Sequence, residues 1–467
     1  MYIDSHAHIF FEDYKSDLDD VLKRAREAGV EAIVVPGTTL ETSEEAVRLA
    51  GQHDDVYATV GIHPHEASKS TPEVLKRIEE LSLNPKVVAI GEIGLDYHYD
   101  FSPRDIQRDV FVKQIEIAVR RNLPIVVHTR ESLEDAFSTV EEAVRLYPDW
   151  RRDKLNIHTR NPALRGVFHC FPGGAEDVWR LLDLGFFVSY PGIVTFKNSP
   201  AIETVKKIGY DHILIETDSP YMSPVPHRGK RNEPANVVLI ARKIAEVFSV
   251  SEEDVGRAAT FNTKKLFNIG PPDLPKIAYK LRNSLYLNIT IRCNADCVFC
   301  DRKGEAIVKG HNLKIEYEPS AEEVIQAIGD PRAYDEVVFC GYGEPTIRMD
   351  VIKDVARWVK EKGGRVRLNT DGHGNIINHR NVVPELAGLI DTVSISLNSI
   401  DPEQYGKIMR LDGERYHAAM VEFARECKKI LPEVVMTVVG IDEIDAVAAR
   451  KFVEDEIGAN FRIRPYF

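Results

Sequence analysis

The sequence has 467 residues, a formal net charge of −13 and a hydrophobic fraction of 43%. That length is too great for one ordinary core and favours two domains. The first residues lack a basic segment followed by an apolar run, and no stretch reaches about 18 apolar residues, so we expect a cytoplasmic protein without an export signal or membrane span. The charge argues against DNA binding driven by net charge, but a local basic groove stays possible.

Residues 1–269 alternate short apolar runs with amphipathic stretches of helical period, such as DLDDVLKRAREAG and RDVFVKQIEIAVRRN. This alternation is typical of parallel strands joined by crossover helices. The runs that we interpret as strands are YIDSHAH, EAIVVPG, VYATVGIHPH, VVAIGEIGLD, LPIVVHTR, GVFHCF, FFVSYPG and ILIETDSP. Eight such units in about 250 residues predict an α/β fold of the TIM type, a (β/α)8 barrel.

Imidazole and carboxylate side chains stand at the ends of these predicted strands. In chain order they are His6, His8, His63, His65, Glu92, His128, His169 and Asp218. Because the carboxyl ends of barrel strands converge, we expect a ring that binds divalent ions such as Zn, Mn or Mg. Glu92 lies on the middle strand of the set and is the natural bridge between two ions. Any single histidine could instead be an ordinary buried or surface residue.

These stretches resemble the TatD family of metal-dependent deoxyribonucleases within the amidohydrolase-like barrels. The matching segments are DSHAH at 4–8, GIHPHEA at 61–67, AIGEIGLDYH at 89–98, LPIVVHTRES at 123–132, FHCFPGG at 168–174, ILIETDSPY at 213–221 and RNEPANV at 231–237. The resemblance implies one metal held by His6, His8, Glu92 and Asp218 and a second held by Glu92, His128 and His169. It places His63 and the Arg231 region near the substrate phosphate and gives Asp218 the proton of the attacking water. Catalytic roles thus fall to Glu92, Asp218 and His63, and the implied partner is single-stranded DNA or another phosphoester.

Two further segments concern the edges of this first domain. The stretch WRRDKLNIHTRNPALR at 150–165 is unusually basic, and it is either a solvated loop or a phosphate-contacting lip beside His158. After Gly270 the sequence PPDLPK stops the last helix and stiffens the chain. We therefore predict a linker at 270–277 and a second domain at 278–467.

Three cysteines follow the strand-like run SLYLNITI. Cys293, Cys297 and Cys300 have the spacing C-x3-C-x2-C. A structural zinc site wants four ligands, and the sequence around His311 offers no second ligand pair of the usual spacing. Three thiolates with one open place fit a [4Fe–4S] cluster whose fourth iron takes an exogenous ligand.

The same region resembles the radical S-adenosylmethionine (SAM) superfamily. Phe299 precedes the last cysteine, and FCGYGEPTIR supplies Gly341, Gly343, Glu344 and Pro345, with Tyr342 in place of the second glycine of the GGEP element. The resemblance implies a partial (β/α)6 barrel, SAM as cosubstrate, a 5′-deoxyadenosyl radical that abstracts hydrogen from an unknown substrate, and an electron donor such as flavodoxin or ferredoxin. Strand-end positions that could contact ribose, substrate or adenine are Asn369, Asp371, Ser396, Asn398, Gly440 and Ile441.

The leading hypothesis is a bifunctional enzyme, a two-metal phosphodiester hydrolase joined to a radical SAM catalyst. The barrel could instead cleave an ester or amide, such as an aminoacyl linkage on tRNA. The second domain could modify a nucleoside or a protein, or its cluster could be a redox sensor that gates the hydrolase.

Overall fold

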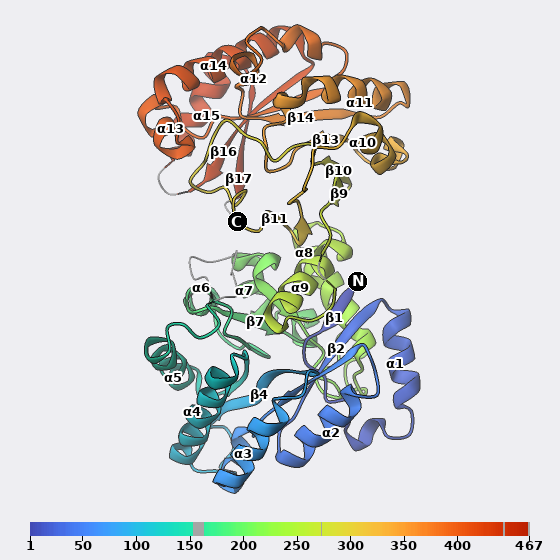
Figure 1. The fold of residues 1–467 in the computed structure, drawn as a ribbon, viewed down its shortest axis with the longest axis vertical. Coiled ribbons are helices and arrows are strands. Elements are labelled where there is room, and N and C mark those ends of the chain that lie inside the picture. Colours follow the sequence, from blue (N-terminus) through green and yellow to red (C-terminus); the bar gives the residue numbers. More distant parts are fainter. Residues whose placement is uncertain (153–162, 272, 442–443, 466–467) are drawn as a thin grey trace. The chain divides into compact units, whose positions relative to one another are not determined.

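The computed structural model describes residues 1–152, 163–271, 273–441 and 444–465. It divides into two compact units, Met1–Pro272 and Asp273–Phe467, which we treat separately (Figure 1). Within the described ranges, no helix combines the length and the apolar character that crossing a bilayer requires.

The first unit is built on an eight-stranded parallel sheet in simple chain order. Its strands are β1 (Tyr2–Asp4), β2 (Val30–Pro36), β3 (Val56–Val60), β4 (Val87–Asp96), β5 (Ile125–Arg130), β6 (Gly166–Phe168), β7 (Phe186–Tyr190) and β8 (Ile213–Ile215). Bonds just beyond β1 and β8 join the first strand to the last, because the amide of Ser5 donates to the Ile215 carbonyl at 3.2 Å and that of His8 to the Ser219 carbonyl at 2.8 Å. The expected (β/α)8 barrel is confirmed.

The helices of this unit lie outside the sheet (Figure 1). They are α1 (Leu18–Glu27), α2 (Leu40–Ala50), α3 (Pro72–Leu81), α4 (Arg104–Arg121), α5 (Leu133–Leu146), α6 (Ala175–Leu184), α7 (Pro200–Ile208), α8 (Val237–Phe248) and α9 (Glu252–Phe267). Local sequence sets their limits. Ser251 caps α9 by accepting from the amide of Asp254 at 3.1 Å, and the helix ends at Asn268 in the left-handed region.

The basic stretch at 150–165 falls mostly on residues 153–162, so His158 and the proposed lip lie outside the described residues. Three of its arginines are described; Arg152 is exposed, whereas Arg151 and Arg165 are buried. Arg151 donates to the carbonyls of Leu164 at 2.7 Å and Leu266 at 2.6 Å, and Arg165 to that of Leu184 at 2.8 Å. These two guanidinium groups therefore satisfy buried backbone carbonyls, which the sequence pattern did not indicate.

The second unit has a seven-stranded sheet in the order β17-β16-β15-β14-β13-β10-β9. Its strands are β9 (Ala278–Leu281), β10 (Ser284–Leu287), β13 (Val337–Phe339), β14 (Val366–Thr370), β15 (Thr392–Ser396), β16 (Glu433–Gly440) and β17 (Asn460–Pro465). From β10 to β17 all pairs are parallel, which confirms the expected partial (β/α)6 barrel. An antiparallel β9 precedes them, and a small hairpin pairs β11 (Ile307–Val308) with β12 (His311–Asn312).

The helices of the second unit are α10 (Ala321–Ile328), α11 (Met349–Glu361), α12 (Gly374–Ile377), α13 (Pro402–Met409), α14 (Gly413–Ile430) and α15 (Ala446–Lys451), the last followed by a π-helix at Phe452–Ile457. They pack on one face of the sheet. Val366 and Leu368 of β14 and Val393 and Ile395 of β15 join helical residues in a single core. The alternate residues of these strands therefore point to the opposite face.

Candidate functional site

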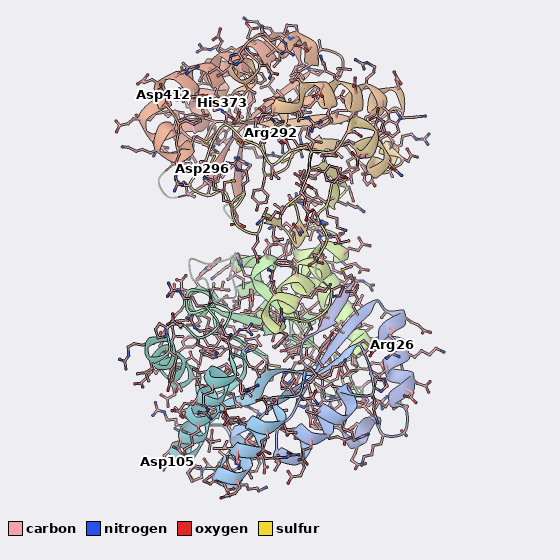
Figure 2. The ribbon with its side chains drawn as sticks, viewed as in Figure 1. Arg26, Asp105, Arg292, Asp296, His373 and Asp412 are labelled. Atoms are coloured by element: carbon pink, nitrogen blue, oxygen red, sulfur yellow. The ribbon has the colours of Figure 1, made fainter. Side chains whose placement is uncertain are left out.

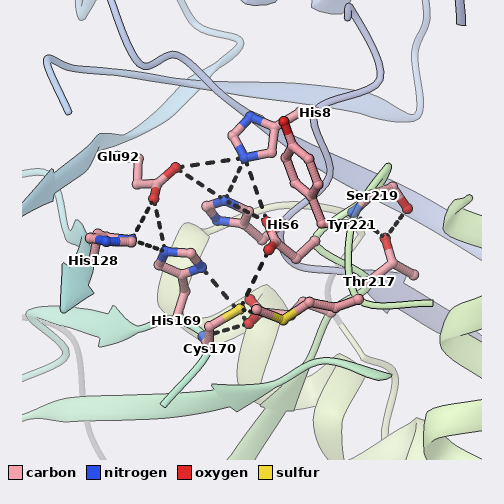
Figure 3. A network of polar contacts seen from close by, with 12 residues as sticks. His6, His8, Glu92, His128, His169, Cys170, Thr217, Ser219 and Tyr221 are labelled. Atoms are coloured by element: carbon pink, nitrogen blue, oxygen red, sulfur yellow. Dashed lines mark hydrogen bonds and ion pairs between the residues drawn. The ribbon is translucent and has the colours of Figure 1, made fainter. Parts of the chain in front are cut away.

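The predicted barrel ligands come together around the carboxylate of Glu92 (Figure 3). One carboxylate oxygen, Oε1, lies 3.0 Å from His128 Nδ1, 2.9 Å from His169 Nε2 and 3.4 Å from His63 Nε2. The other, Oε2, lies 3.4 Å from His6 Nε2 and 3.6 Å from His8 Nε2. The two oxygens of one side chain thus face two different groups of imidazoles.

Asp218 completes the group on the side of His6 and His8. Its Oδ1 lies 3.7 Å from His6 Nε2 and 3.6 Å from His8 Nε2. The two imidazole Nε2 atoms are 3.2 Å apart. The candidate ligand atoms of His6, His8 and Glu92 all lie within 4.8 Å of one another, as do those of His63, Glu92 and His128. Nitrogen and carboxylate donors at this spacing fit two divalent ions.

Burial and neighbouring charges shift the pKa values of these groups in different directions. Burial, assisted by the charge of His169, lowers the pKa of His6 to about 4, and burial with His128 lowers that of His63 to about 4. Burial opposes protonation of His169 and His128, but the charge of Glu92 raises the pKa of His169 to about 9, and hydrogen bonds to Asp96 and Glu92 raise that of His128. Burial alone would raise the pKa of Glu92, but the charges of His169 and His63 place it well below its usual value. A metal ion would therefore displace protons from His128 and His169, because neutral imidazoles and ionised carboxylates are the forms that ligate metals.

Arg231, which the sequence placed near the substrate phosphate, is engaged elsewhere. Its Nη1 and Nη2 donate to the two carboxylate oxygens of Asp17 at 2.8 and 2.6 Å, and its guanidinium lies 4.8 Å from the ring centroid of Tyr14. These contacts do not include the histidine cluster around Glu92. They join the start of α1 to the loop after β8.

The second unit places its three cysteines on the loop after β10, and none forms a disulfide. The loop is held from two directions. The amides of Asp296 and Val298 donate to the Met409 and Ile408 carbonyls at the end of α13, at 3.1 and 2.9 Å. Arg302 donates to the carbonyls of Ile291, Cys293 and Ala295 at 3.3, 3.4 and 3.0 Å. Arg292, which directly precedes Cys293 in the sequence, and Asp296, which directly precedes Cys297, are labelled in Figure 2.

The glycine-rich segment after β13 packs against the cysteine loop. A side chain at Gly343 would come within 2.6 Å of the Arg292 carbonyl, and the amide of Glu344 donates to that carbonyl at 2.9 Å. The structure thus explains why a glycine stands at position 343, because two backbones are in close contact there. The sequence did not reveal this contact. Tyr342, the departure from GGEP, donates through its hydroxyl to the Ile307 carbonyl at 2.7 Å.

Glu344 ties the ends of β13 and β14 together. Its Oε1 accepts from the Thr346 amide at 3.0 Å and from the hydroxyls of Thr346 and Thr370 at 2.6 and 2.7 Å, and its Oε2 accepts from the Asp371 amide at 2.8 Å. Burial, with the charge of Asp371, raises the pKa of Glu344 to about 8. The hydrogen bonds described for Glu344 are all to residues of the same unit.

Other predicted cosubstrate contacts have the following places. Phe299 is half-buried against the core of the unit. Asn398, at the end of β15 with a φ of 56°, donates to the Met409 sulfur at 3.0 Å, and the Met409 sulfur lies 3.4 Å from the thiol of Cys297. Gly440 and Ile441 lie at the end of β16, exposed and half-buried respectively.

Comparison with known proteins decides the family. The profile of the TatD related DNase family matches residues 3–268. The chain belongs to this family. The profile of the Radical SAM superfamily matches residues 287–453, so a radical SAM domain follows the TatD barrel.

Two curated relatives and one solved structure illustrate the match. YabD of Bacillus subtilis, named an uncharacterized metal-dependent hydrolase, is 42% identical over 270 residues, which is 58% of this chain and 100% of YabD. A 3′-5′ ssDNA/RNA exonuclease TatD of Shigella flexneri is 34% identical over 263 residues, covering 55% of this chain and 95% of that protein. The crystal structure of the TatD homolog YJJV of Escherichia coli is 28% identical with a TM-score of 0.52, covering 58% of this chain and 98% of that one. These similarities establish a metal-dependent hydrolase barrel.

The TatD barrel also contains a carboxylate that the sequence analysis missed. The Oδ2 atom of buried Asp96 lies 2.9 Å from His65 Nε2 and 3.1 Å from His128 Nε2. Burial opposes ionisation of Asp96, but bonds and charge from His128 and His65 hold its pKa well below the usual range. Asp96 thus leaves His128 Nδ1 to face Glu92. The signal was present at the end of GEIGLD, where Asp96 closes the same strand that carries Glu92.

Asp4 and Glu216 support the other side of the TatD ring from buried positions. Asp4 accepts from the amide and hydroxyl of Thr217 at 2.9 and 2.6 Å, which fixes the loop that carries Asp218. Glu216 accepts from the Cys170 amide and the Ser189 hydroxyl, both at 2.6 Å. Burial raises the pKa of Asp4 to about 8 and also raises that of Glu216.

Proposed function

We propose that the TatD barrel hydrolyses phosphodiester bonds with two divalent ions, and that single-stranded nucleic acid is its substrate. The observation that carries this proposal is the division of the Glu92 carboxylate between the pair His6 and His8 and the group around His128. The name of the Shigella flexneri relative, a 3′-5′ ssDNA/RNA exonuclease, supports the substrate class.

We assign the residues as follows. His6, His8, Glu92 and Asp218 would hold one ion, and Glu92, His128 and His169 the other, with Zn, Mn or Mg as candidates. When bound, such ions supply Lewis acidity and lower the pKa of water. Asp218 then takes a proton from the attacking water, and His63, which lies 3.4 Å from Glu92 Oε1, orients the phosphate beside the ring.

The test uses two substrates that report different activities of the protein. Bis(p-nitrophenyl) phosphate reports hydrolysis alone, and a labelled single-stranded oligonucleotide reports nuclease action. In Glu92→Gln we expect both activities to fall by at least about a hundredfold, the scale on which a single transition-state contact acts. Glu131→Gln, at an exposed carboxylate paired with His98 at 2.7 Å, is the matched control and should change neither. Hydrolysis of aminoacyl-tRNA without oligonucleotide cleavage would contradict the phosphodiester assignment.

We propose that the radical SAM domain spans residues 278–467 after a linker at 270–277. Cys293, Cys297 and Cys300 would hold one [4Fe–4S] cluster, which supplies the electron that cleaves SAM. The proposed SAM contacts are Phe299, Gly341, Gly343, Glu344, Pro345 and Asn398. An electron donor such as flavodoxin or ferredoxin would serve the cluster, and the substrate of this domain is left open.

Anaerobic reconstitution tests this half. We expect about four irons per chain and formation of 5′-deoxyadenosine with dithionite as reductant. Cys297→Ala should lose both, whereas Cys427→Ala, at a thiol buried in α14, should keep the iron. Tightly bound zinc at the three cysteines, or a cluster that forms without cleaving SAM, would contradict the proposal.

A further inference from the structure

The sheet face opposite the helices of the second unit carries polar and charged side chains. On β14 the core residues Val366 and Leu368 alternate with Arg367 and Asn369, and on β17 the register sets Arg462 opposite Thr437 and Arg464 opposite Val439. A parallel sheet buried on both faces normally shows continuous apolar runs. This inner face is therefore suited to a ligand and not to a second packing layer.

Arg464 is the first of three arginines on this face. Its Nη2 donates weakly to Ser396 Oγ at 3.2 Å and to Asn398 Oδ1 at 3.4 Å, while its Nε is buried without a partner. The charged or titratable groups that act on it are the thiols of Cys340 and Cys297 and the guanidinium of Arg462. None of these is a carboxylate, so a buried cation has no counter-ion among its described neighbours.

Arg367, on β14, is also an arginine with a buried, unpartnered Nε. It donates to the Tyr286 hydroxyl at 3.0 Å and pairs with Glu336 at 3.2 Å, yet its Nε is also buried and unpartnered. The charge of Arg462 is felt by both Arg367 and Arg464, and Glu336 is the carboxylate that Arg367 and Arg462 share. Glu336 is thus the described carboxylate that acts on Arg367 and Arg462, while Glu344 acts on the neighbouring Cys340 thiol.

Arg367 and Arg464 lie on strands that are not neighbours in the sheet. Strands β15 and β16 lie between β14 and β17, and three strand spacings would hold the outer two about 14 Å apart in a flat sheet. Even so, Arg367 and Arg464 both lie near enough to the Cys340 thiol to act on its pKa, which burial raises. Beside them Asn369 Oδ1 is buried and unpartnered, an acceptor facing the same region.

We propose that this inner face binds an oxyanion of the radical SAM domain's substrate, a carboxylate or a phosphate, through Arg464 and Arg367. The Nε of each guanidinium has no hydrogen-bond partner in the structure and is the donor available to such an anion, while Nη2 of each is bonded within the protein. Asn369 accepts from a hydroxyl or amine next to the anion. The site thus defines a small polar anion as the substrate class, which the proposed function leaves open.

The carboxylate of SAM itself is a less suitable occupant. Arg367 lies inside β14, paired with Thr392 of β15 and Val338 of β13, whereas the proposed SAM element at 341–345 begins only after β13 has ended. Arg367 therefore lies deeper in the sheet than the proposed SAM element, whereas Arg464 bonds Asn398, a proposed SAM contact, so the test below includes SAM affinity.

The test is hydrogen–deuterium exchange of the full chain in potassium phosphate, in potassium acetate and in potassium chloride of equal ionic strength. We expect phosphate or acetate to slow exchange at 365–371 and 460–464 by about threefold at twice its dissociation constant. The more protective anion identifies the group. The protection should be lost in Arg464→Met and Arg367→Met, partly kept in Arg464→Lys, and unchanged in Arg357→Met, an exposed arginine paired with Asp354 on α11.

Stability gives a second, independent readout. In chloride buffer, Arg464→Met should raise the unfolding midpoint by about 2 °C or more, because an uncompensated buried charge is removed. A lower midpoint, or a variant that does not fold, would make Arg464 a structural residue and overturn the proposal. Protection in chloride equal to that in phosphate and acetate would overturn it as well.

A separate arm measures SAM affinity of the reconstituted chain by equilibrium dialysis. We expect Arg464→Met to change it by less than about threefold. A loss of tenfold or more would assign the guanidinium to the SAM carboxylate, at a cost of about 1.4 kcal/mol, and would overturn the substrate site. Each of these readouts is independent of the barrel, so failure here leaves the hydrolase proposal untouched.

Discussion

At the scale of single residues, Asp96 holds His65 and His128 from behind the predicted metal ligands. A carboxylate that orients a ligating imidazole typically contributes about 10- to 100-fold in metal affinity. We therefore expect Asp96→Asn to weaken metal binding by that factor in a competition assay with a fluorescent chelator. Glu131→Gln, whose carboxylate contacts only His98 among the described residues, should retain wild-type affinity. Unchanged affinity in Asp96→Asn would remove the positioning role.

Gly343 gives a second prediction at this scale. A Cβ atom there would collide with the backbone that leads into the cysteine loop, 2.6 Å from the Arg292 carbonyl. We expect Gly343→Ala to lower the free energy of unfolding of the second unit by about 1–3 kcal/mol. Gly440→Ala is the comparison, because its Cβ would meet the movable end of Ile463 at 3.3 Å. Equal midpoints in urea for the two variants would contradict the close-packing argument.

At the scale of elements, α13 positions the cysteine loop through its last turn. The carbonyls of Ile408 and Met409 accept from the loop, and Tyr405 of the same helix lies 2.8 Å from His373 Nε2. His373, labelled in Figure 2, is fully buried, and its Nδ1 lies 2.8 Å from Asn294 Nδ2 in the loop. The helix and the loop thus share one polar network.

Removing the Tyr405 hydroxyl tests that network. Tyr405→Phe should destabilise the second unit by about 1–2 kcal/mol, because His373 loses a buried partner. Tyr317→Phe removes an exposed hydroxyl that bonds Glu323 at 2.8 Å and should have little effect. The comparison is made by urea unfolding, and similar losses in both variants would exclude a special role for the network.

The elements also show where sequence patterns succeed and where they stop. Short apolar runs located every strand of the first barrel, because burial on both faces makes such strands apolar throughout. Strand β9 was missed because AYKL is only four residues long, and its pairing with β10 depends on a two-residue turn at Arg282, which has a φ of 54°.

The sequence could identify candidate site residues whose side chains are unusual at a strand end, such as His6 and Glu92. Asp96 and Asp4 were not found, because a carboxylate at a strand end looks the same whether it binds a metal, a histidine or a backbone amide. The ion pair of Arg231 was not found for a related reason. Its partner Asp17 lies 214 positions away in sequence, and only the fold brings the two together.

At the scale of the whole molecule, each unit has its own hydrophobic core. The described core residues of the first end at Ile269, and those of the second begin at Leu285 with Ile277 packed against them. We expect two calorimetric transitions in the metal-loaded chain. Chelation should lower the midpoint temperature of only the first transition. The first unit would lose the few kilocalories per mole of stability that bound ions give at about 100 times their dissociation constant. Tyr405→Phe should lower the midpoint temperature of only the second transition. A chelator that shifts both transitions equally would contradict separate cores.

The central claim is that Glu92 joins two metal ions in one site, and electron paramagnetic resonance of the Mn²⁺-loaded chain tests it most directly. Ions about 3.5–4 Å apart on a shared carboxylate are magnetically coupled. We predict a coupled spectrum for the wild-type chain and isolated Mn²⁺ signals for Glu92→Gln. A coupled spectrum that survives in Glu92→Gln, or isolated ions in the wild type at saturation, would contradict the account.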